Sequence, residues 1–370
     1  MKIKMKISNI CYYSIVFILF FTTYISLVYR KEIELQNLVT FIKNINIIFL
    51  LLVSMILVFF KLQNKQILKK DIKVILLLII FSIFLKKLYL CFFIIIISSF
   101  INKQIRLKCT FFIFTFFYIL ILILNNLGFL EFNNIDYGVR MFGENKIIRY
   151  ALGFAHPNTA MSLLIPIFSL LYYLYYPKYK KIVLGIILIV GEIIFELTFS
   201  RTTFLLIILF VILILIKDKY IKKLKFLFLL EGFFITFITF YLPPRYNQSD
   251  ILLKINGLVS GRFWFFNQYF IKEKISFFGN SGMEKIYLSL PLDNMYLRIL
   301  YENGIVGLSI LVFLIFITMY ILFKNQDYKA VRIFSIILIF GFMESMGYYY
   351  YYCIIYFIIS DYIFRKEGVL

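Results

Sequence analysis

Residues 304–323 read GIVGLSILVFLIFITMYILF, an apolar stretch without a single charged side chain. An α-helix needs about 20 predominantly apolar residues to cross the hydrocarbon core of a bilayer. This stretch therefore predicts a transmembrane helix. Comparable runs recur along the chain, and we predict further helices over 10–29, 44–60, 72–85, 88–101, 109–124, 159–176, 182–199, 203–216, 224–242, 331–347 and 349–364.

The composition indicates the same class of protein. Hydrophobic residues make up 62% of the 370 residues and charged residues only 16%, whereas a soluble domain has about half and about a quarter. The apolar residues also form continuous runs instead of the stripes of a soluble helix. We predict an all-α, polytopic integral membrane protein, in which residues 1–370 form one membrane domain of about twelve transmembrane helices.

Two regions of the predicted helices, residues 72–101 and the first run, leave alternatives open. Residues 72–101 form either two short helices that turn at Lys86 and Lys87, or one long helix with a re-entrant piece. The first run resembles a signal peptide, but no small-residue cleavage site follows it. We therefore expect it to remain as the first helix.

The charge distribution predicts the orientation of the chain. Lysine and arginine exceed aspartate and glutamate by 40 to 19, for a formal net charge of +21. Most of the excess lies in short loops, which is typical of cytoplasmic loops under the positive-inside rule. We expect both termini in the cytoplasm and the long loops, about 125–156 and 243–303, on the outer side. Nucleic acid is not an expected partner, because its binding requires basic residues gathered on one soluble surface.

The loop between the ninth and tenth predicted helices, residues 243–303, is the largest segment outside the membrane. Pro243 and Pro244 prevent the ninth helix from continuing. Gly257, Gly261, Gly279 and Gly282 indicate a folded loop with turns instead of a long helix. Loops longer than about 15 residues are often functional, so this loop is expected to carry part of a site.

The chain's single histidine lies in residues 149–158, which read RYALGFAHPN. Pro157 suits the first turn of a helix, and this places His156 and Asn158 at the helix N-terminus. Free N–H groups there favour a phosphate or a carboxylate. The alternative is an ordinary helix start with a histidine on the surface.

A second polar motif, Ser200-Arg201, separates two apolar runs at the predicted outer face. An arginine that reaches for the membrane surface more often marks a cytoplasmic helix end. Glu192 and Glu196 share one face of the preceding helix. They either neutralise Arg201 or line a polar cavity.

Two more motifs lie in or next to the long loop. Residues 260–264, SGRFW, place Arg262 beside the only tryptophan, Trp264; this pair suits a sugar diphosphate or an interfacial aromatic segment. Residues 292–297, LDNMYL, and 301–307, YENGIVG, lead into a membrane helix. Glu344 would be costly inside the penultimate helix without a partner.

In this order, the four motifs resemble the O-antigen polymerase and ligase superfamily, and most closely its Wzy-type polymerases of capsule and exopolysaccharide in Gram-positive bacteria. The resemblance covers roughly residues 149–307. The matching positions are Gly153 to Asn158 for the glycine-aromatic-x-His-Pro-Asn signature, Ser200-Arg201, Arg262 with Trp264, and Asp293-Asn294-x-Tyr296-Leu297 followed by Glu302-x-Gly304-x-x-Gly307. Asp293 stands where ligases of this superfamily carry a histidine, which favours a polymerase.

The resemblance implies a metal-independent glycosyltransferase without a cofactor. It would polymerise undecaprenyl-diphosphate-linked repeat units into capsular, exo- or O-antigen polysaccharide at the outer face of the bacterial cytoplasmic membrane. Arg201 and Arg262 would stabilise the leaving diphosphate. Asp293, or second His156, would accept the proton of the attacking hydroxyl. The implied substrate-binding residues are Arg149, Asn158, Trp264, Asn294, Tyr296 and Glu302, and the implied partners are a flippase and a chain-length regulator.

Three alternatives remain open. An O-antigen-type ligase would use the same motifs. A flippase or transporter of lipid-linked oligosaccharide would explain the helices and the basic charge, but it predicts internal repeats, which the sequence does not show. In a membrane subunit without chemistry, Arg201, Arg262 and Glu344 would only form structural pairs.

Overall fold

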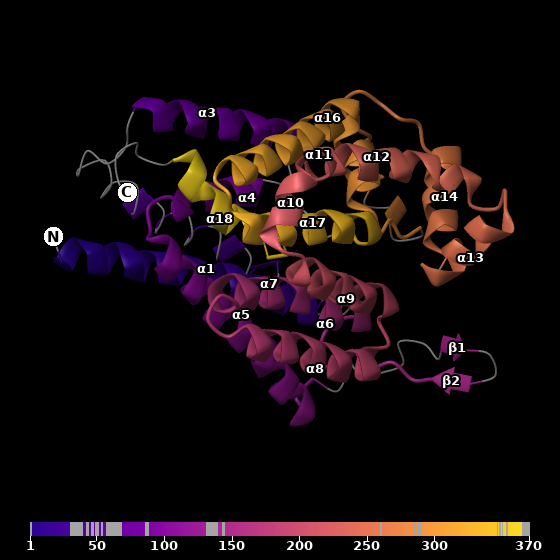
Figure 1. The fold of residues 1–370 in the computed structure, drawn as a ribbon, viewed down its shortest axis with the longest axis horizontal. Coiled ribbons are helices and arrows are strands. Elements are labelled where there is room, and N and C mark those ends of the chain that lie inside the picture. Colours follow the sequence, from indigo (N-terminus) through magenta and orange to yellow (C-terminus); the bar gives the residue numbers. More distant parts are fainter. Residues whose placement is uncertain are drawn as a thin grey trace. The chain divides into compact units, whose positions relative to one another are not determined.

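In the computed structural model the described part of the chain is mostly helical (Figure 1). The residues it describes are 2–29, 40–41, 44–45, 48, 52, 55–56, 69–85, 89–130, 140–142, 145–259, 261–283, 286–287, 290–345, 347, 349, 351–352 and 354–364. Strands within this part of the chain are confined to one antiparallel hairpin of β1 (Arg140–Phe142) and β2 (Asn145–Ile147). The helical class is confirmed, with this hairpin as the exception.

Among the described residues, four helical stretches are long and apolar enough to cross a membrane, by length and composition. Three shorter apolar helices accompany them, Ile72–Phe81, Tyr89–Ser98 and Arg201–Leu215. These helices support a membrane-embedded protein. The total of about twelve spans stays a prediction, and most of the run 44–60, like Lys86 and Lys87, lies outside the described residues. The four long stretches are Asn9–Val28, Lys103–Asn126, Pro157–Tyr175 and Met295–Lys324.

The chain divides into two compact units, and each is described by itself. Unit 1 comprises residues 1–72, 95–211 and 366–370, and unit 2 comprises residues 73–94 and 212–365. The helices α3 (Lys69–Phe84), α4 (Tyr89–Ser98) and α9 (Arg201–Leu215) extend across the boundaries.

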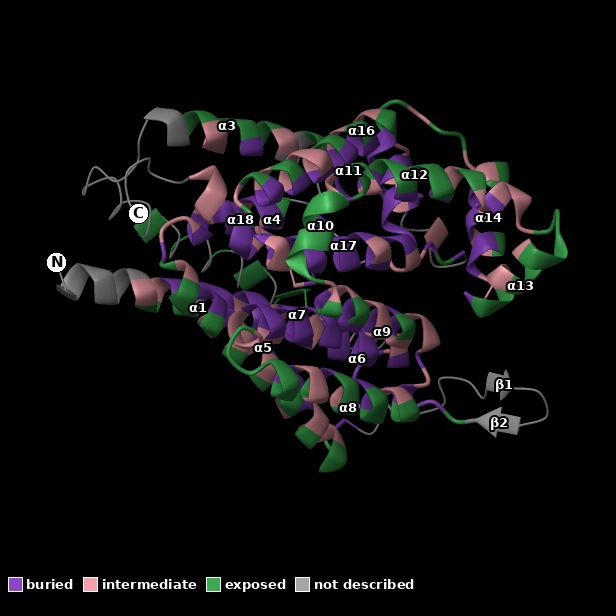
Figure 2. Cartoon of the chain, viewed as in Figure 1, coloured by how far each residue is buried: buried purple, intermediate pink, exposed green. Residues whose placement is uncertain are grey.

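Unit 1 is built from helices packed on one another through aromatic side chains. In it α1 (Lys2–Val28) packs on α5 (Lys103–Asn126), α5 packs on α7 (Leu164–Tyr175), and α6 (Pro157–Ser162) and α7 pack on α8 (Lys180–Thr198). The Tyr24 ring stacks on the Phe117 ring. The Tyr24 hydroxyl donates a hydrogen bond to the Phe114 carbonyl at 3.0 Å. The outer face of α8 is largely exposed (Figure 2) and apolar, with Ile189 and Ile193 among its exposed residues. Such a face suits lipid contact.

Unit 2 is centred on α16 (Met295–Lys324), which packs on α17 (Tyr328–Met343) and on α12 (Glu231–Tyr241) (Figure 1). Its other helices are α10 (Asp218–Lys223), α11 (Lys225–Leu229) and α18 (Ile355–Ile363). The buried Arg332 donates to the Leu213 carbonyl and to Asp218, at 2.8 and 2.7 Å. A cation thus satisfies a carbonyl at the end of α9, where the helix dipole favours positive charge.

Several predicted helix limits were wrong. The run 224–242 is divided at Leu230 into α11 and α12, and α16 begins at Met295 instead of residue 304. The helix predicted over 331–347 ends earlier, since α17 stops at Met343. The helix predicted over 349–364 begins later, since α18 starts at Ile355. A hydropathy pattern does not detect polar helical turns such as 295–303. Capping and tertiary packing stabilise these turns, and neither depends on contact of apolar side chains with lipid.

Residues 243–303 carry secondary structure of their own. They contain the 3-10 turn η3 (Pro243–Arg245), α13 (Asp250–Leu258), α14 (Arg262–Lys272) and the first turns of α16. The predicted turns at Gly261, Gly279 and Gly282 are confirmed, with φ of 75°, 92° and 76°. The turn predicted at Gly257 was wrong, because Gly257 lies inside α13. The extracytoplasmic position of this segment stays a prediction.

A break in α16 is the main irregularity of unit 2. Gly304 has φ 74° and ψ −172° inside the helix, so the backbone N–H groups after it lose their helical partners. The segment before α16 replaces them: Ile305 N–H donates to Ser276 O at 3.0 Å and Val306 N–H donates to Phe277 O at 3.1 Å. The helix break and the segment 276–280 therefore form one hydrogen-bonded junction.

Candidate functional site

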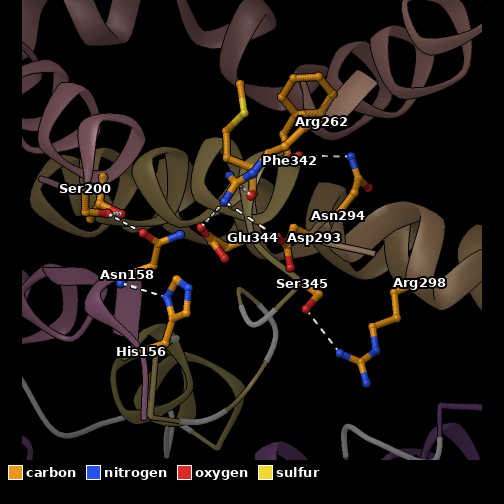
Figure 3. Close-up of polar contacts among 12 residues, drawn as sticks. His156, Asn158, Ser200, Arg262, Asp293, Asn294, Arg298, Phe342, Glu344 and Ser345 are labelled. Carbon is orange, nitrogen blue, oxygen red and sulfur yellow. Dashed lines mark hydrogen bonds and ion pairs between the residues drawn. The ribbon is translucent and has the colours of Figure 1, made fainter. Parts of the chain in front are cut away.

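A buried arginine lies at the centre of the polar cluster in unit 2. Arg262 is the first residue of α14, and Gly261 at the preceding cap position has the positive φ that starts the helix there. The guanidinium reaches the end of α17, where Nη1 donates to the Met343 carbonyl. Its Nη2 lies 2.6 Å from Glu344 Oε1 and 3.7 Å from Asp293 Oδ2 (Figure 3). Two carboxylates that lie far from Arg262 in the sequence thus approach its guanidinium.

The electrostatics of this cluster keep Arg262 charged. Burial by itself lowers the pKa of the guanidinium, but attraction to Glu344 and then to Asp293 raises it, and the net shift is upward. Glu344 was predicted inside the penultimate helix, and this position was wrong: it is the first residue after α17 ends. Its side chain is largely buried, and Arg262 is the partner that a buried carboxylate requires.

Asn294 and Tyr296, both predicted to bind substrate, are fully buried and serve helix packing. Asn294 caps α16, because its Oδ1 accepts from Leu297 N–H at 2.9 Å, and its Nδ2 donates to the Phe342 carbonyl at 3.0 Å. The Tyr296 hydroxyl donates to Leu338 O at 3.2 Å. In this structure both side chains fix the position of Asp293 between α16 and α17, and neither presents a surface to a ligand.

Arg298 is a member of this cluster that the sequence analysis missed. Its Nη1 donates to Ser345 Oγ at 3.1 Å (Figure 3). Its Nε lies 2.8 Å from Glu302 Oε1, and its guanidinium lies over the Tyr287 ring, 4.8 Å from the centroid. Glu302, predicted to bind substrate, is thus engaged with Arg298. The i, i+4 spacing of Arg298 and Glu302 was the available signal, since oppositely charged residues at that spacing face each other on a helix.

Trp264 lies on the exposed side of α14. Its side chain is among the exposed large hydrophobics and packs edge-on against Phe265, with ring centroids 4.9 Å apart. The predicted role of Trp264 as a sugar platform stays a prediction. Ser260, which opens the same motif, lies outside the described residues.

Unit 1 holds a second polar cluster, around Asn158. Its Oδ1 accepts from Ser200 Oγ at 3.1 Å (Figure 3) and from Arg149 Nη2 at 2.6 Å. Arg149 is buried and also donates through Nε to the Thr198 carbonyl at 2.9 Å, at the C-terminus of α8. The predicted motifs at 149–158 and 200–201 therefore meet in space, and Asn158 links them.

His156 occupies the helix start that the sequence predicted, with Pro157 as the first residue of α6. The ring accepts a hydrogen bond through Nδ1 from the Asn158 N–H, at 3.0 Å. A neutral imidazole that accepts through Nδ1 carries its proton on Nε2. His156 in this state presents a donor, which argues against its predicted role as a base.

Strained backbone marks both motifs of unit 1. Leu152 and Phe199 have φ of 54° and 49°, and non-glycine residues in this region cluster at functional sites. Phe199 turns the chain between α8 and α9, so that Arg201 becomes the first residue of α9. Glu192 and Glu196 lie exposed on α8.

The predicted residues thus fall into two groups. Arg149, His156, Asn158 and Arg201 belong to unit 1, and Arg262, Asp293, Glu302 and Glu344 belong to unit 2. A common site for all of them stays a prediction of the sequence. Within unit 2 the arrangement offers a buried cation with an exposed carboxylate next to it. These two groups are able to hold an anion and to accept a proton.

Comparisons with protein-family models, with curated proteins and with solved structures gave no match. Among the described residues, no group of three or more histidine, cysteine, aspartate or glutamate side chains is placed to hold a metal ion.

Proposed function

We propose that the protein polymerises lipid-linked oligosaccharide repeat units at the outer face of a bacterial cytoplasmic membrane, as a metal-independent glycosyltransferase. The observation that carries this proposal is the cluster of Arg262 with Asp293 and Glu344, in a chain with helices long and apolar enough to cross a membrane. The order of motifs, which resembles that of the Wzy-type polymerases, supplies the substrate class.

The reaction needs two groups that this cluster offers. The bond between the anomeric carbon of the donor glycan and its diphosphate breaks, and the electron pair stays on the diphosphate. A guanidinium held in a low-dielectric site stabilises that charge. The hydroxyl of the acceptor repeat forms the new bond to the anomeric carbon and gives its proton to the Asp293 carboxylate, which later returns it to water.

The polar residues of unit 1 are proposed to assist the same reaction. Arg201 is proposed to supply a second cation, and Arg149 with Asn158 to hold the strained turn before α9 in place. His156 is proposed to donate through Nε2 to a substrate oxygen. The flippase and the chain-length regulator remain proposed partners.

One observation favours a second function, transport of the same lipid-linked sugars. α16 is broken at Gly304, and broken membrane helices are common at the binding sites of transporters. A flippase moves its substrate between leaflets without changing it, so the products distinguish the two functions.

The test uses the purified protein in lipid discs, supplied with lipid-linked repeat units extracted from a strain that lacks the gene. The expected result is a ladder of polymer in the wild type and none in Arg262→Ala. Arg245→Ala is the matched control, because Arg245 lies in the same segment and contacts Tyr241, with its guanidinium 4.3 Å from the ring centroid. A single unchanged band in all samples, with transfer of the repeat unit between leaflets in vesicles, would instead establish the flippase.

A further inference from the structure

The two carboxylates on Arg262 are held unequally. Both approach the same atom, Nη2, but Glu344 lies at 2.6 Å with 13% of its side chain accessible, and Asp293 lies at 3.7 Å with 42% accessible. Glu344 and the Met343 carbonyl hold the guanidinium by hydrogen bonds. Asp293 is the more distant and the more accessible of the two carboxylates, so its place is the one that a dissolved anion takes most easily.

The Asp293 carboxylate can leave this place without a movement of the backbone. The next residue, Asn294, is fixed by its cap on α16 and by its bond to the Phe342 carbonyl. Asp293 precedes α16, and the first backbone hydrogen bond of the helix runs from the Arg298 N–H to the Asn294 carbonyl, at 3.0 Å. Rotation about the Asp293 side-chain torsions is therefore sufficient to exchange it for another anion.

The charge of the cluster favours this exchange. Counted formally, with every carboxylate ionised, Arg262 and Arg298 with Asp293, Glu302 and Glu344 make two cations and three anions, a net charge of −1. A diphosphate that approaches an intact cluster is repelled. Once Asp293 turns away, the diphosphate gains the guanidinium that Asp293 had neutralised.

We propose that Asp293 occupies the place of the substrate's diphosphate on Arg262 and is displaced from it when the donor binds. This inference rests on the proposed function. Displacement frees the carboxylate from its ion pair, so that it accepts the proton of the acceptor hydroxyl only after the donor is bound. The exchange itself forms and breaks no covalent bond; one anion replaces another on the guanidinium.

The chain contains its own reporter for this exchange. Trp264, the only tryptophan, lies two residues after Arg262 on α14 and is exposed. Inorganic diphosphate is titrated into the full-length protein in lipid discs, and binding is followed by Trp264 fluorescence and, independently, by equilibrium dialysis. The variants are Asp293→Asn, Asp293→Ala, Arg262→Ala and the control Asp250→Asn, which removes a carboxylate from the exposed start of α13 in the same segment.

If Asp293 competes with the diphosphate, both Asp293 variants bind it about two- to five-fold more tightly than the wild type, the range expected for a partly exposed ion pair. Asp250→Asn keeps the wild-type affinity and Arg262→Ala loses binding. Polymer formation is not expected to follow this affinity: Asp293→Asn binds diphosphate more tightly but forms no polymer, because it lacks the carboxylate that accepts the proton.

Affinities of both Asp293 variants equal to or below that of the wild type would overturn the exchange, while diphosphate binding itself would still support the proposed function. Absence of diphosphate binding in the wild type by both methods would overturn the proposed function and this inference together. A thermal unfolding curve for each variant identifies one that has lost its fold, and the other Asp293 variant then decides.

Discussion

Replacement of Gly304 by alanine is expected to destabilise unit 2 more than any other single methyl addition in α16. Gly304 has φ 74° and ψ −172°, a region that glycine alone adopts readily. A Cβ at this position would overlap the carbonyl of Phe277 and the backbone nitrogen of Gly279. These are backbone atoms of the junction, so no side-chain rotation can relieve the overlap.

The size of the effect follows from two contributions. A residue held in such a backbone region costs about 1–3 kcal/mol. The overlap also pushes away the segment that accepts from the N–H groups of Ile305 and Val306, and each lost hydrogen bond costs about 1 kcal/mol. The free energy of unfolding should therefore fall by roughly 3–5 kcal/mol.

The assay is reversible unfolding in mixed micelles titrated with dodecyl sulfate, followed by Trp264 fluorescence. The control is Gly257→Ala in α13, where an added Cβ meets no atom within 4 Å. Alanine is the better helix former by about 1 kcal/mol, so this variant should be neutral or slightly more stable. A Gly304→Ala protein within about 0.5 kcal/mol of the wild type would show that α16 is not broken at Gly304.

Three further predictions concern single side chains. Asn294→Ala removes the cap of α16 and the bond to the Phe342 carbonyl, and should lower the free energy of unfolding by about 2 kcal/mol in the same titration; an unchanged midpoint would contradict the double role. Arg332→Lys keeps the charge but loses the planar fork that holds the end of α9, including the Ile216 carbonyl, and should cost about 1–3 kcal/mol; a melt equal to that of the wild type would refute it. Ser249→Ala removes the cap of α13, where Ser249 Oγ accepts from the Leu252 N–H at 3.2 Å, at about 1 kcal/mol. It should speed hydrogen exchange within 250–258 only, and slower or unchanged exchange there would argue against the cap.

The site was predictable where a motif is local. The helix start at Pro157 and the turns at Gly261 and Gly279 follow from backbone preferences of single residues, and the structure has them. The partner of Arg262 was not predictable, because Glu344 follows it by 82 residues and the pairing depends on α14 meeting the end of α17. Arg298 was missed for a related reason. Its i, i+4 pair with Glu302 is typical of an ordinary helix surface, and only the folded chain brings Ser345 into contact with Arg298.

The sequence by itself determined that this chain is helical and belongs in a membrane. The transfer of a side chain into lipid depends on that side chain and its neighbours in one segment, so runs such as 304–323 are sufficient to predict a span. The tertiary structure alone decided that α16 begins at Met295, that it breaks at Gly304, and that Asp293 and Glu344 share one guanidinium. Caps, backbone junctions and ion pairs depend on atoms from segments distant in the sequence, and these atoms come together only when the chain folds.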